Sequence, residues 1–182
     1  MHRPEINDFI EAWEMIRDEM LAVTTKDDSV SRPKCDYDEL DPQVVRKMLE
    51  CEAWSYIQDT DKKWWNFPLF TWGEPTGPAL KLAPRTVEFM NKIGGVHFAG
   101  FSLLEPNGVI SPHFDDVACP GPIGELTYHL GLECPEGCYF LQDGRIIQEE
   151  DGKLFNFICT QNHAAINLSA KRRVILYMTF TK

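Results

Sequence analysis

The segment Ser-Pro-His-Phe-Asp-Asp at residues 111–116 places His113 and Asp115 two positions apart. In an extended chain, residues i and i+2 point to the same side, so this imidazole and this carboxylate can converge on one point. A second histidine, His163, begins another apolar run much further along the chain. Two histidines and one carboxylate form the facial triad that binds Fe(II) in non-heme oxygenases and leaves coordination positions open. These residues are therefore the candidate metal ligands, and a chance pairing in a polar loop is the alternative.

Three nearby polar residues have simpler interpretations when they are taken alone. Asp116 competes with Asp115 as a carboxylate, but strand alternation places it on the opposite side, where we expect it to be solvated. His129 lies in the apolar run LTYHLGL, where a single histidine is typical of a satisfied core residue. Ser102, in FSLL, is expected to bond locally within an apolar strand.

Arg173 lies in the apolar run RRVILYMTF, and two interpretations of it remain open. If the cation faces inward it needs an anionic partner, because an unpaired buried charge is costly. That partner is either a structural Asp or Glu, or a dicarboxylate co-substrate bound by the planar guanidinium through two parallel hydrogen bonds. Arg172 points to the opposite face and is expected at the surface.

The runs that carry these residues have the composition of β-strands. From residue 96 onwards, short stretches rich in β-branched and aromatic residues alternate with turn signals. The stretches are VHFAGFSLL, GVISPH, LTYHLGLE, CYFLQ, RIIQE, KLFNFIC, HAAINLS and RRVILYMTF. Asp143-Gly144, between CYFLQ and RIIQE, predicts a hairpin. Strands of this length and spacing predict a sandwich, jelly roll or barrel.

The first part of the chain has helical periodicity instead. Apolar residues recur at three- and four-residue steps at Ile6, Phe9, Ile10, Trp13, Ile16 and Met20. The polar residues 24–40 predict a surface connection. Asp41-Pro42 predicts the start of a second helix, with a buried side formed by Val44, Val45, Met48, Leu49 and Ile57.

Residues 60–82 hold many aromatic side chains among prolines and glycines, which predicts an irregular segment. These rings either wall a pocket as a lid or fill a helix–sheet interface. A short third helix follows Pro84 and ends at Gly94-Gly95. We predict a single domain over 1–182, with a helical and aromatic-rich buttress at 1–95 packed on one sheet of a jelly-roll core at 96–182.

Composition excludes several classes of function. The chain has 182 residues, 18 Lys and Arg against 28 Asp and Glu, and a net charge of −10. Without a basic patch, nucleic-acid binding is not expected. No apolar run is long enough to predict a membrane span, and the N-terminus lacks the apolar core of a signal peptide, which predicts a cytoplasmic protein. The cysteines are then expected to be thiols, and Cys134 and Cys138 have the wrong spacing for a redox or zinc motif.

From about Trp65 to the C-terminus, the order and spacing of several motifs resemble the aspartyl/asparaginyl β-hydroxylase family of Fe(II)/2-oxoglutarate-dependent oxygenases. The motifs are WWNFPLF, APRT, FSLLEPNGVISPH, HLGLECPEGC and HAAINLSAKRRVIL. The resemblance implies a mainly β fold, a double-stranded β-helix of the jelly-roll or cupin-like kind. It also implies Fe(II) as cofactor, with 2-oxoglutarate and O2 as co-substrates.

Carried over by position, the family's metal histidines fall on His113 and His163. The arginine and serine that bind the distal carboxylate of 2-oxoglutarate fall on Arg173 and Ser102. The histidine at the other carboxylate end of the co-substrate falls on His129. For His129 and Ser102, the resemblance thus implies a binding role in place of the simpler interpretation above.

Two departures from the family pattern affect the site. The animal members have glycine at the position of Asp115, whereas small bacterial relatives, including proline cis-hydroxylases, keep the same His-x-Asp. The resemblance to these smaller members implies Asp115 as the third metal ligand. Thr127 stands in place of an arginine that helps to hold 2-oxoglutarate in the animal enzymes, and the segment 114–128 is longer than theirs. Both changes affect the proximal contacts of the co-substrate.

The expected activity is hydroxylation of an amino acid, or of an amino-acid residue in a small peptide, with release of succinate and CO2. The sequence shows no repeat domain or membrane anchor of the kind attached to the animal protein-modifying enzymes, which favours a small-molecule substrate. Two alternatives remain open. One is a jelly-roll binding protein whose metal site is structural or vestigial, and the other is a cupin-like enzyme that does not use 2-oxoglutarate.

Overall fold

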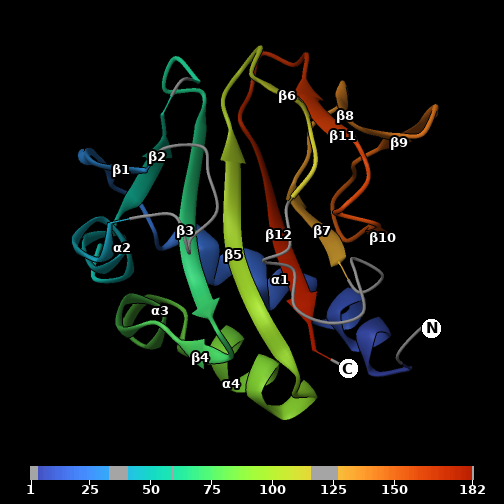
Figure 1. Ribbon diagram of the computed structural model, residues 1–182. Coiled ribbons are helices and arrows are strands. Elements are labelled where there is room, and N and C mark those ends of the chain that lie inside the picture. Colours follow the sequence, from blue (N-terminus) through green and yellow to red (C-terminus); the bar gives the residue numbers. More distant parts are fainter. Residues whose placement is uncertain (1–3, 33–40, 59, 116–126, 182) are drawn as a thin grey trace.

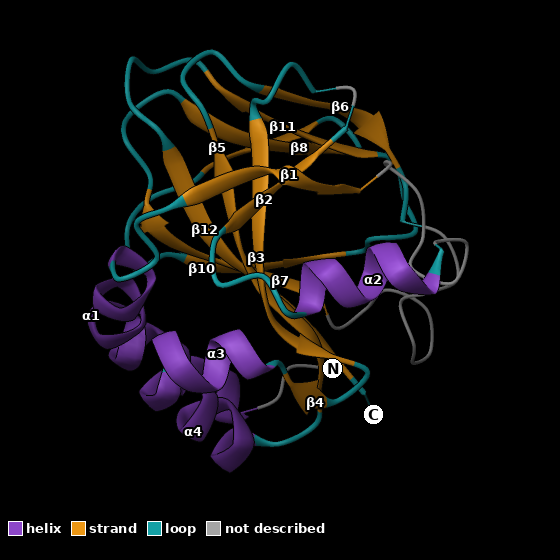
Figure 2. Cartoon of the chain, turned by 90° about the vertical axis from the view of Figure 1, so that its left-hand side faces the viewer, coloured by secondary structure: helices purple, strands orange, loops and turns teal. Residues whose placement is uncertain are grey.

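In the computed structural model, two β-sheets face each other, and helices cover the outer side of the larger sheet (Figures 1 and 2). The structure describes residues 4–32, 41–58, 60–115 and 127–181. All eight strands expected after residue 96 are present. The prediction of a jelly-roll core with helices packed on one sheet is confirmed.

The larger sheet has eight strands in the order β1-β2-β3-β5-β12-β7-β10, with β4 added beside β3. Its strands are β1 (Lys26–Arg32), β2 (Trp54–Ile57), β3 (Trp64–Thr71), β4 (Glu74–Pro75), β5 (Val96–Leu104), β7 (Thr127–Glu133), β10 (Leu154–Phe157) and β12 (Arg173–Phe180). The long central strands β5 and β12 pair antiparallel, with Ile175 opposite Ser102. This pair forms the middle of the front view in Figure 1.

The smaller sheet has four strands in the order β6-β11-β8-β9. They are β6 (Val109–His113), β8 (Cys138–Gln142), β9 (Arg145–Gln148) and β11 (His163–Asn167). The predicted hairpin between β8 and β9 is confirmed. Asp143 and Gly144 both have positive φ, 48° and 74°, as a two-residue hairpin turn of type I′ requires.

The helices are η1 (Pro4–Asn7), α1 (Asp8–Leu21), α2 (Pro42–Leu49), α3 (Gly77–Leu82) and α4 (Pro84–Ile93). Helix α1 crosses the back of the larger sheet and contacts β7 and α4 (Figure 1). The predicted start of α2 is confirmed, because the Asp41 carboxylate accepts a hydrogen bond from the Gln43 N–H at 2.7 Å. Helix α4 begins at Pro84 and ends before Gly94, as predicted.

The two faces of the larger sheet bury different sets of side chains. On β12, Val174, Leu176 and Met178 belong to the core on the helix side. Because side chains alternate along a strand, Arg173 and Tyr177 face the smaller sheet. The layer between the two sheets is lined by Leu104, Ile110, Phe140, Phe157, Cys159 and Ala165, with Trp64, Ile147, Phe155 and Tyr177 packed against them.

Three predictions for the first part of the chain are wrong. The connection over 24–40 contains β1, which pairs with β2, and its residues 33–40 lie outside the described part. Ile57 belongs to β2 and not to the second helix, which ends at Leu49. The segment 60–82, predicted as irregular, contains β3, β4 and α3. Tertiary pairing outweighed the turn-rich composition of these stretches.

The positions of the aromatic rings on β3 show which of them fill the helix–sheet interface. Trp65, Phe67 and Phe70 fill the core on the helix side, whereas Trp64 packs between the sheets. Trp72 is exposed. Among the described residues, none of the helices combines the length and the apolar character needed to cross a membrane.

Candidate metal centre

His113 and His163 are brought together by the pairing of β6 with β11. They are direct partners in the antiparallel ladder, with ring centroids 4.4 Å apart. The register shifts between this pair and the next one, Ile110 with Ala165, so β6 carries one extra residue there. Pro112 lies in this irregular stretch, a position that suits proline because it has no N–H to donate to the ladder. The shift lets both Ile110 and His113 face the interior.

Asp115 completes the cluster just beyond the end of β6. Its backbone N–H donates to the Cys159 carbonyl at 2.9 Å, which ties it to the loop before β11. One carboxylate oxygen lies 3.6 Å from Nε2 of His113, and the other lies 3.9 Å from Nε2 of His163. One ligand atom from each residue lies within 4.8 Å of the other two. The structure thus brings together the three residues predicted as metal ligands.

Backbone carbonyls fix both imidazoles in the tautomer that a metal requires. Nδ1 of His113 donates to the Ser111 carbonyl and Nδ1 of His163 donates to the Gln161 carbonyl, each at 2.8 Å. A carbonyl can only accept, so in the neutral ring the proton is on Nδ1 and the Nε2 lone pair is available. Outer hydrogen bonds of this kind orient metal-binding histidines.

The cluster is open on one side and closed on the other. The His113 and Asp115 side chains are 20% and 32% exposed, whereas the His163 side chain is 6% exposed. The His163 ring packs against Phe140 and Phe157, with centroids 5.7 and 5.1 Å away. Two imidazole nitrogens and a carboxylate with no thiolate suit Fe(II) better than a structural zinc site. The donor set therefore fits the predicted metal.

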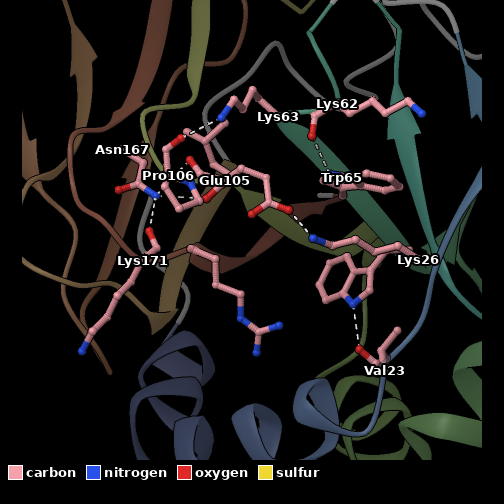
Figure 3. A network of polar contacts seen from close by, with 12 residues as sticks. Val23, Lys26, Lys62, Lys63, Trp65, Glu105, Pro106, Asn167 and Lys171 are labelled. Atoms are coloured by element: carbon pink, nitrogen blue, oxygen red, sulfur yellow. Dashed lines mark hydrogen bonds and ion pairs between the residues drawn. The ribbon is translucent and has the colours of Figure 1, made fainter.

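A polar network holds the turn that leads into β6 (Figure 3). Asn167, at the end of β11 and fully buried, donates through Nδ2 to the carbonyls of Leu104 and Glu105 at 3.1 Å and of Lys171 at 2.7 Å. Lys63 donates to the Pro106 carbonyl at 3.1 Å. Because Asn167 belongs to β11 and the turn precedes β6, this network fixes the two histidine-bearing strands relative to each other.

The remaining predicted site residues lie in the larger sheet. Ser102, His129 and Arg173 alternate with the helix-side core residues of β5, β7 and β12, so all three face the smaller sheet. The Ser102 hydroxyl accepts a hydrogen bond from Nε1 of Trp64 at 2.9 Å, a non-local bond instead of the local one expected from the residue alone. Thr127 is buried at the start of β7, opposite Phe157 and Thr179.

Arg173 forms a buried ion pair with Glu149, a residue that was not among the predicted site residues. Nε of Arg173 donates to one carboxylate oxygen of Glu149 at 2.6 Å, and Nη2 donates to the other at 2.5 Å. Nδ1 of His129 lies 3.2 Å from the second of these oxygens. This arrangement agrees with the interpretation that Arg173 pairs with a structural carboxylate. A carboxylate ending the apolar run RIIQE was the only signal in the sequence.

The charges in this cluster stabilise one another. Burial would raise the pKa of Glu149, but Arg173 and His129 lower it to about 2, so Glu149 is ionised. Burial lowers the pKa of His129, and Glu149 opposes that shift in part. The cluster therefore holds one positive and one negative charge beside an imidazole whose charged form is disfavoured by burial.

Aromatic rings pack both on His129, which contacts the ion pair, and on the His113–Asp115–His163 cluster. The His129 ring contacts Phe140 and Phe157, with centroids 5.2 and 4.8 Å away, and these two rings also pack on His163. The Tyr177 ring packs on the His129 ring, with centroids 5.8 Å apart, and its hydroxyl donates a hydrogen bond to the Asp115 carboxylate at 3.4 Å. The two clusters thus belong to one continuous interior.

Other sequence expectations concern cysteines and the segment after Asp115. Cys134 and Cys138 are free thiols, and burial raises the pKa of both, that of Cys138 to about 11. They are therefore protonated and weak nucleophiles at neutral pH. Asp116, Cys119 and most of the longer segment 114–128 lie outside the described residues.

The chain is similar to known proteins in sequence and in fold. A family model described as aspartyl/asparaginyl β-hydroxylase matches residues 10–182. The ornithine lipid ester-linked acyl 2-hydroxylase of Rhizobium tropici is 33% identical over 127 residues, which is 68% of this chain. The match spans only 43% of that relative's length.

Solved structures with related folds are more distant. A 2OG-Fe(II) oxygenase family oxidoreductase from Burkholderia pseudomallei has a TM-score of 0.44 and 16% identity, over 65% of this chain and 68% of its own. A cupin domain of an XRE family transcriptional regulator from Enterobacter cloacae has a TM-score of 0.43 and 14% identity, over 65% of this chain and 96% of its own.

Proposed function

The chain belongs to the aspartyl/asparaginyl β-hydroxylase family, and from this premise we propose that it is an Fe(II)- and 2-oxoglutarate-dependent dioxygenase. The observation that carries the proposal is the cluster of His113, Asp115 and His163, with both Nε2 atoms directed by Nδ1–carbonyl bonds. The proposed reaction is hydroxylation of an amino acid, or of an amino-acid residue in a small peptide.

These three residues would hold Fe(II) through two Nε2 atoms and the Asp115 carboxylate. Bound Fe(II) would supply activation of O2, coupled to oxidation of 2-oxoglutarate to succinate and CO2, with one oxygen atom entering succinate and the other a substrate C–H bond. The chain's own residues hold the ligand geometry. The carbonyls of Ser111 and Gln161 keep the rings oriented, and Phe140 and Phe157 exclude water from the buried side.

For 2-oxoglutarate, the family resemblance assigns Arg173 and Ser102 to the far carboxylate. It assigns His129 and Thr127 to the region around the other carboxylate end of the co-substrate. Support comes from Ser102, His129 and Arg173 facing the same interior layer as the metal-binding residues. The fit is partial, because Glu149 occupies two nitrogens of Arg173.

The substrate class can be narrowed by the chemistry that the names of the family and the relative share. The β-carbon of an aspartyl residue carries the side-chain carboxyl group, and carbon 2 of an ester-linked acyl chain is bonded to the ester carbonyl. Both names therefore describe hydroxylation at a carbon next to a carbonyl carbon. We propose that this chain hydroxylates such a carbon. A fatty-acyl chain of an amino-acid lipid is the second candidate substrate, favoured by the relative.

The test is a 2-oxoglutarate consumption assay of the Fe(II)-loaded protein. Free amino acids, short Asp- or Asn-containing peptides and ornithine lipid vesicles are assayed in parallel, with mass detection of a product that has gained one oxygen atom. Succinate release that is lost in Asp115→Ala and His163→Ala would exclude a structural or vestigial metal site. Product formation independent of 2-oxoglutarate and insensitive to Arg173→Ala would indicate a cupin-like enzyme of another class. If Fe(II) and 2-oxoglutarate neither stabilise the fold nor yield succinate, the proposal fails.

A further inference from the structure

Glu149 is paired with Arg173, the residue that would bind the far carboxylate of the co-substrate. It takes Nε and Nη2 of Arg173 in a side-on pair at 2.6 and 2.5 Å, and both side chains are 1% exposed. The same carboxylate also contacts Nδ1 of His129 at 3.2 Å. A single protein carboxylate thus touches the two residues assigned above to opposite ends of 2-oxoglutarate.

The pair changes what an incoming ligand meets. Arg173 and Glu149 carry opposite charges in direct contact, so an approaching carboxylate meets a neutralised pair and not a free guanidinium. It also meets the negative charge of Glu149 nearby, in a buried setting where charges are weakly screened. Both effects reduce the gain in free energy from a second carboxylate on the ligand.

One part of the guanidinium is still available. Nη1 of Arg173 is buried, and among the described residues it has no hydrogen-bond partner. Buried donors in native proteins are nearly always satisfied by protein, water or ligand. Nη1 is therefore the donor that Arg173 can present to a ligand while Glu149 stays in place.

The backbone around Glu149 holds it in position. The Glu149 N–H donates to the Cys138 carbonyl at 2.9 Å. The following turn is fixed on β7, because the Gly131 N–H donates to the Lys153 carbonyl at 3.0 Å and the Gly152 N–H donates to the Gly131 carbonyl at 2.9 Å. Moving the carboxylate out of the interior would require breaking a buried ion pair whose backbone is tied on both sides, which is costly.

We propose that Glu149 is a specificity-determining residue. It is a built-in counter-ion that competes with the far carboxylate of the co-substrate for Arg173, so that only Nη1 of Arg173 remains to bind that carboxylate. The inference rests on the proposed function, because it concerns the same co-substrate site. Its consequence is weak discrimination between a 2-oxo dicarboxylate and a 2-oxo monocarboxylate of the same length.

The test measures binding to the Fe(II)-loaded protein without oxygen, by titration calorimetry. The ligands are 2-oxoglutarate and 2-oxopentanoate, which lacks the far carboxylate. In the wild type, the two dissociation constants are expected to differ by less than about tenfold. With a free guanidinium, each charge-assisted hydrogen bond to the far carboxylate would tighten the binding of 2-oxoglutarate by roughly tenfold to a hundredfold. Glu149→Gln is expected to bind 2-oxoglutarate about tenfold or more tightly than the wild type, and 2-oxopentanoate with unchanged affinity.

The matched control is Glu150→Gln, which removes a neighbouring exposed carboxylate paired with Lys153 and is expected to leave both affinities unchanged. The ratio of the two dissociation constants in the wild type is measured without any variant, so the test remains decisive if Glu149→Gln does not fold. A wild-type ratio above about tenfold, or a folded Glu149→Gln that gains less than about tenfold for 2-oxoglutarate, overturns the inference.

The same measurements separate this inference from the proposed function. If the wild type binds 2-oxoglutarate and releases succinate while Glu149→Gln has unchanged selectivity, only the role of Glu149 is wrong. If neither 2-oxo acid binds to the Fe(II)-loaded wild type or to Glu149→Gln, both the inference and the proposed use of 2-oxoglutarate are wrong.

Discussion

His113 and His163 are direct partners across the β6–β11 ladder, with ring centroids 4.4 Å apart. A sheet ladder fixes the relative position of the residues that it pairs, so the two imidazoles are placed by the fold and not by a ligand. Asp115 is placed differently, by one backbone bond to the Cys159 carbonyl and one contact with the Tyr177 hydroxyl. The histidine pair is therefore the rigid part of the cluster, and the carboxylate is its adjustable part.

The first prediction concerns Asp115 as a metal ligand. Asp115→Ala is expected to weaken Fe(II) binding by about a hundredfold or more, because even outer hydrogen bonds to metal ligands are worth about 10–100-fold. The affinity is measured by anaerobic titration calorimetry. Phe114→Ala is the matched control, since Phe114 is 64% exposed beside the cluster and is expected to leave the affinity unchanged. Equal Fe(II) affinity in the wild type and Asp115→Ala would exclude this carboxylate as a ligand.

The second prediction concerns Asn167, which joins β11 to the turn before β6. Asn167→Ala removes the side-chain donor that the carbonyls of Leu104, Glu105 and Lys171 share, and the free energy of unfolding is expected to fall by about 2–4 kcal/mol. Asn167→Asp keeps the acceptor for Ser169 but removes the donors, so a loss of similar size is expected.

Urea unfolding measures these losses, with Asn91→Ala as the control, because Asn91 is exposed on α4. Since Asn167 also fixes the spacing of β6 and β11, Fe(II) affinity is expected to fall in Asn167→Ala and to stay constant in the control. Wild-type stability in Asn167→Ala would mean that the network in Figure 3 is peripheral.

The fold of the second half was predictable from the sequence because each strand there has a local signal. Short runs rich in β-branched residues lie between turns, and Asp143-Gly144 supplies a turn that few other residue pairs permit. The strand β3 had no such signal, because Pro68 interrupts it. The sheet accommodates this proline with a register shift after Pro68 and with Gly100 opposite, where a Cβ would lie 3.1 Å from the Phe67 carbonyl oxygen.

The candidate site also has one part that was predictable from the sequence and one part that was not. The convergence of His113 and Asp115 followed from alternation along one extended segment, a local rule that needs no knowledge of the fold. The partner of Arg173 was not predictable, because Glu149 directly follows the strand β9 and meets Arg173 only through the packing of the two sheets. The sequence could indicate that Arg173 needs an anion, but not whether protein or ligand supplies it.

The third prediction concerns the titration of Glu149. Arg173 and His129 lower its pKa to about 2 from an ordinary value of 4.5. The folded pKa is below the unfolded one, so the stabilisation from this group is complete above about pH 4.5 and is lost as the pH falls towards 2. A carboxyl-carbon NMR titration, with the signal assigned through Glu149→Gln, is expected to show a midpoint well below 4.5.

Arg173→Met provides the comparison for this titration. Without the guanidinium, burial dominates and disfavours the charged form, so the Glu149 midpoint is expected to rise above 4.5. A wild-type midpoint near 4.5, or equal midpoints in the two proteins, would show that the ion pair with Arg173 does not control the charge of Glu149.

The fourth prediction concerns Gly131, on which the turn after Glu149 rests. A Cβ at Gly131 would lie 1.9 Å from the Glu150 carbonyl oxygen and 2.7 Å from its carbonyl carbon. Both are backbone atoms, so the turn must move. Gly131→Ala is therefore expected to lower the free energy of unfolding by about 2–4 kcal/mol and to displace Glu149 from Arg173.

Gly77→Ala is the matched control, because nothing lies within 4 Å of a Cβ there and the residue opens α3. It is expected to leave stability unchanged or to raise it by up to about 1 kcal/mol. Urea unfolding compares the two variants, and the Glu149 carboxyl titration reports on the ion pair. If Gly131→Ala is as stable as Gly77→Ala and the Glu149 midpoint is unchanged, the turn does not hold Glu149 against Arg173, and the ion pair must be maintained by the side chains alone.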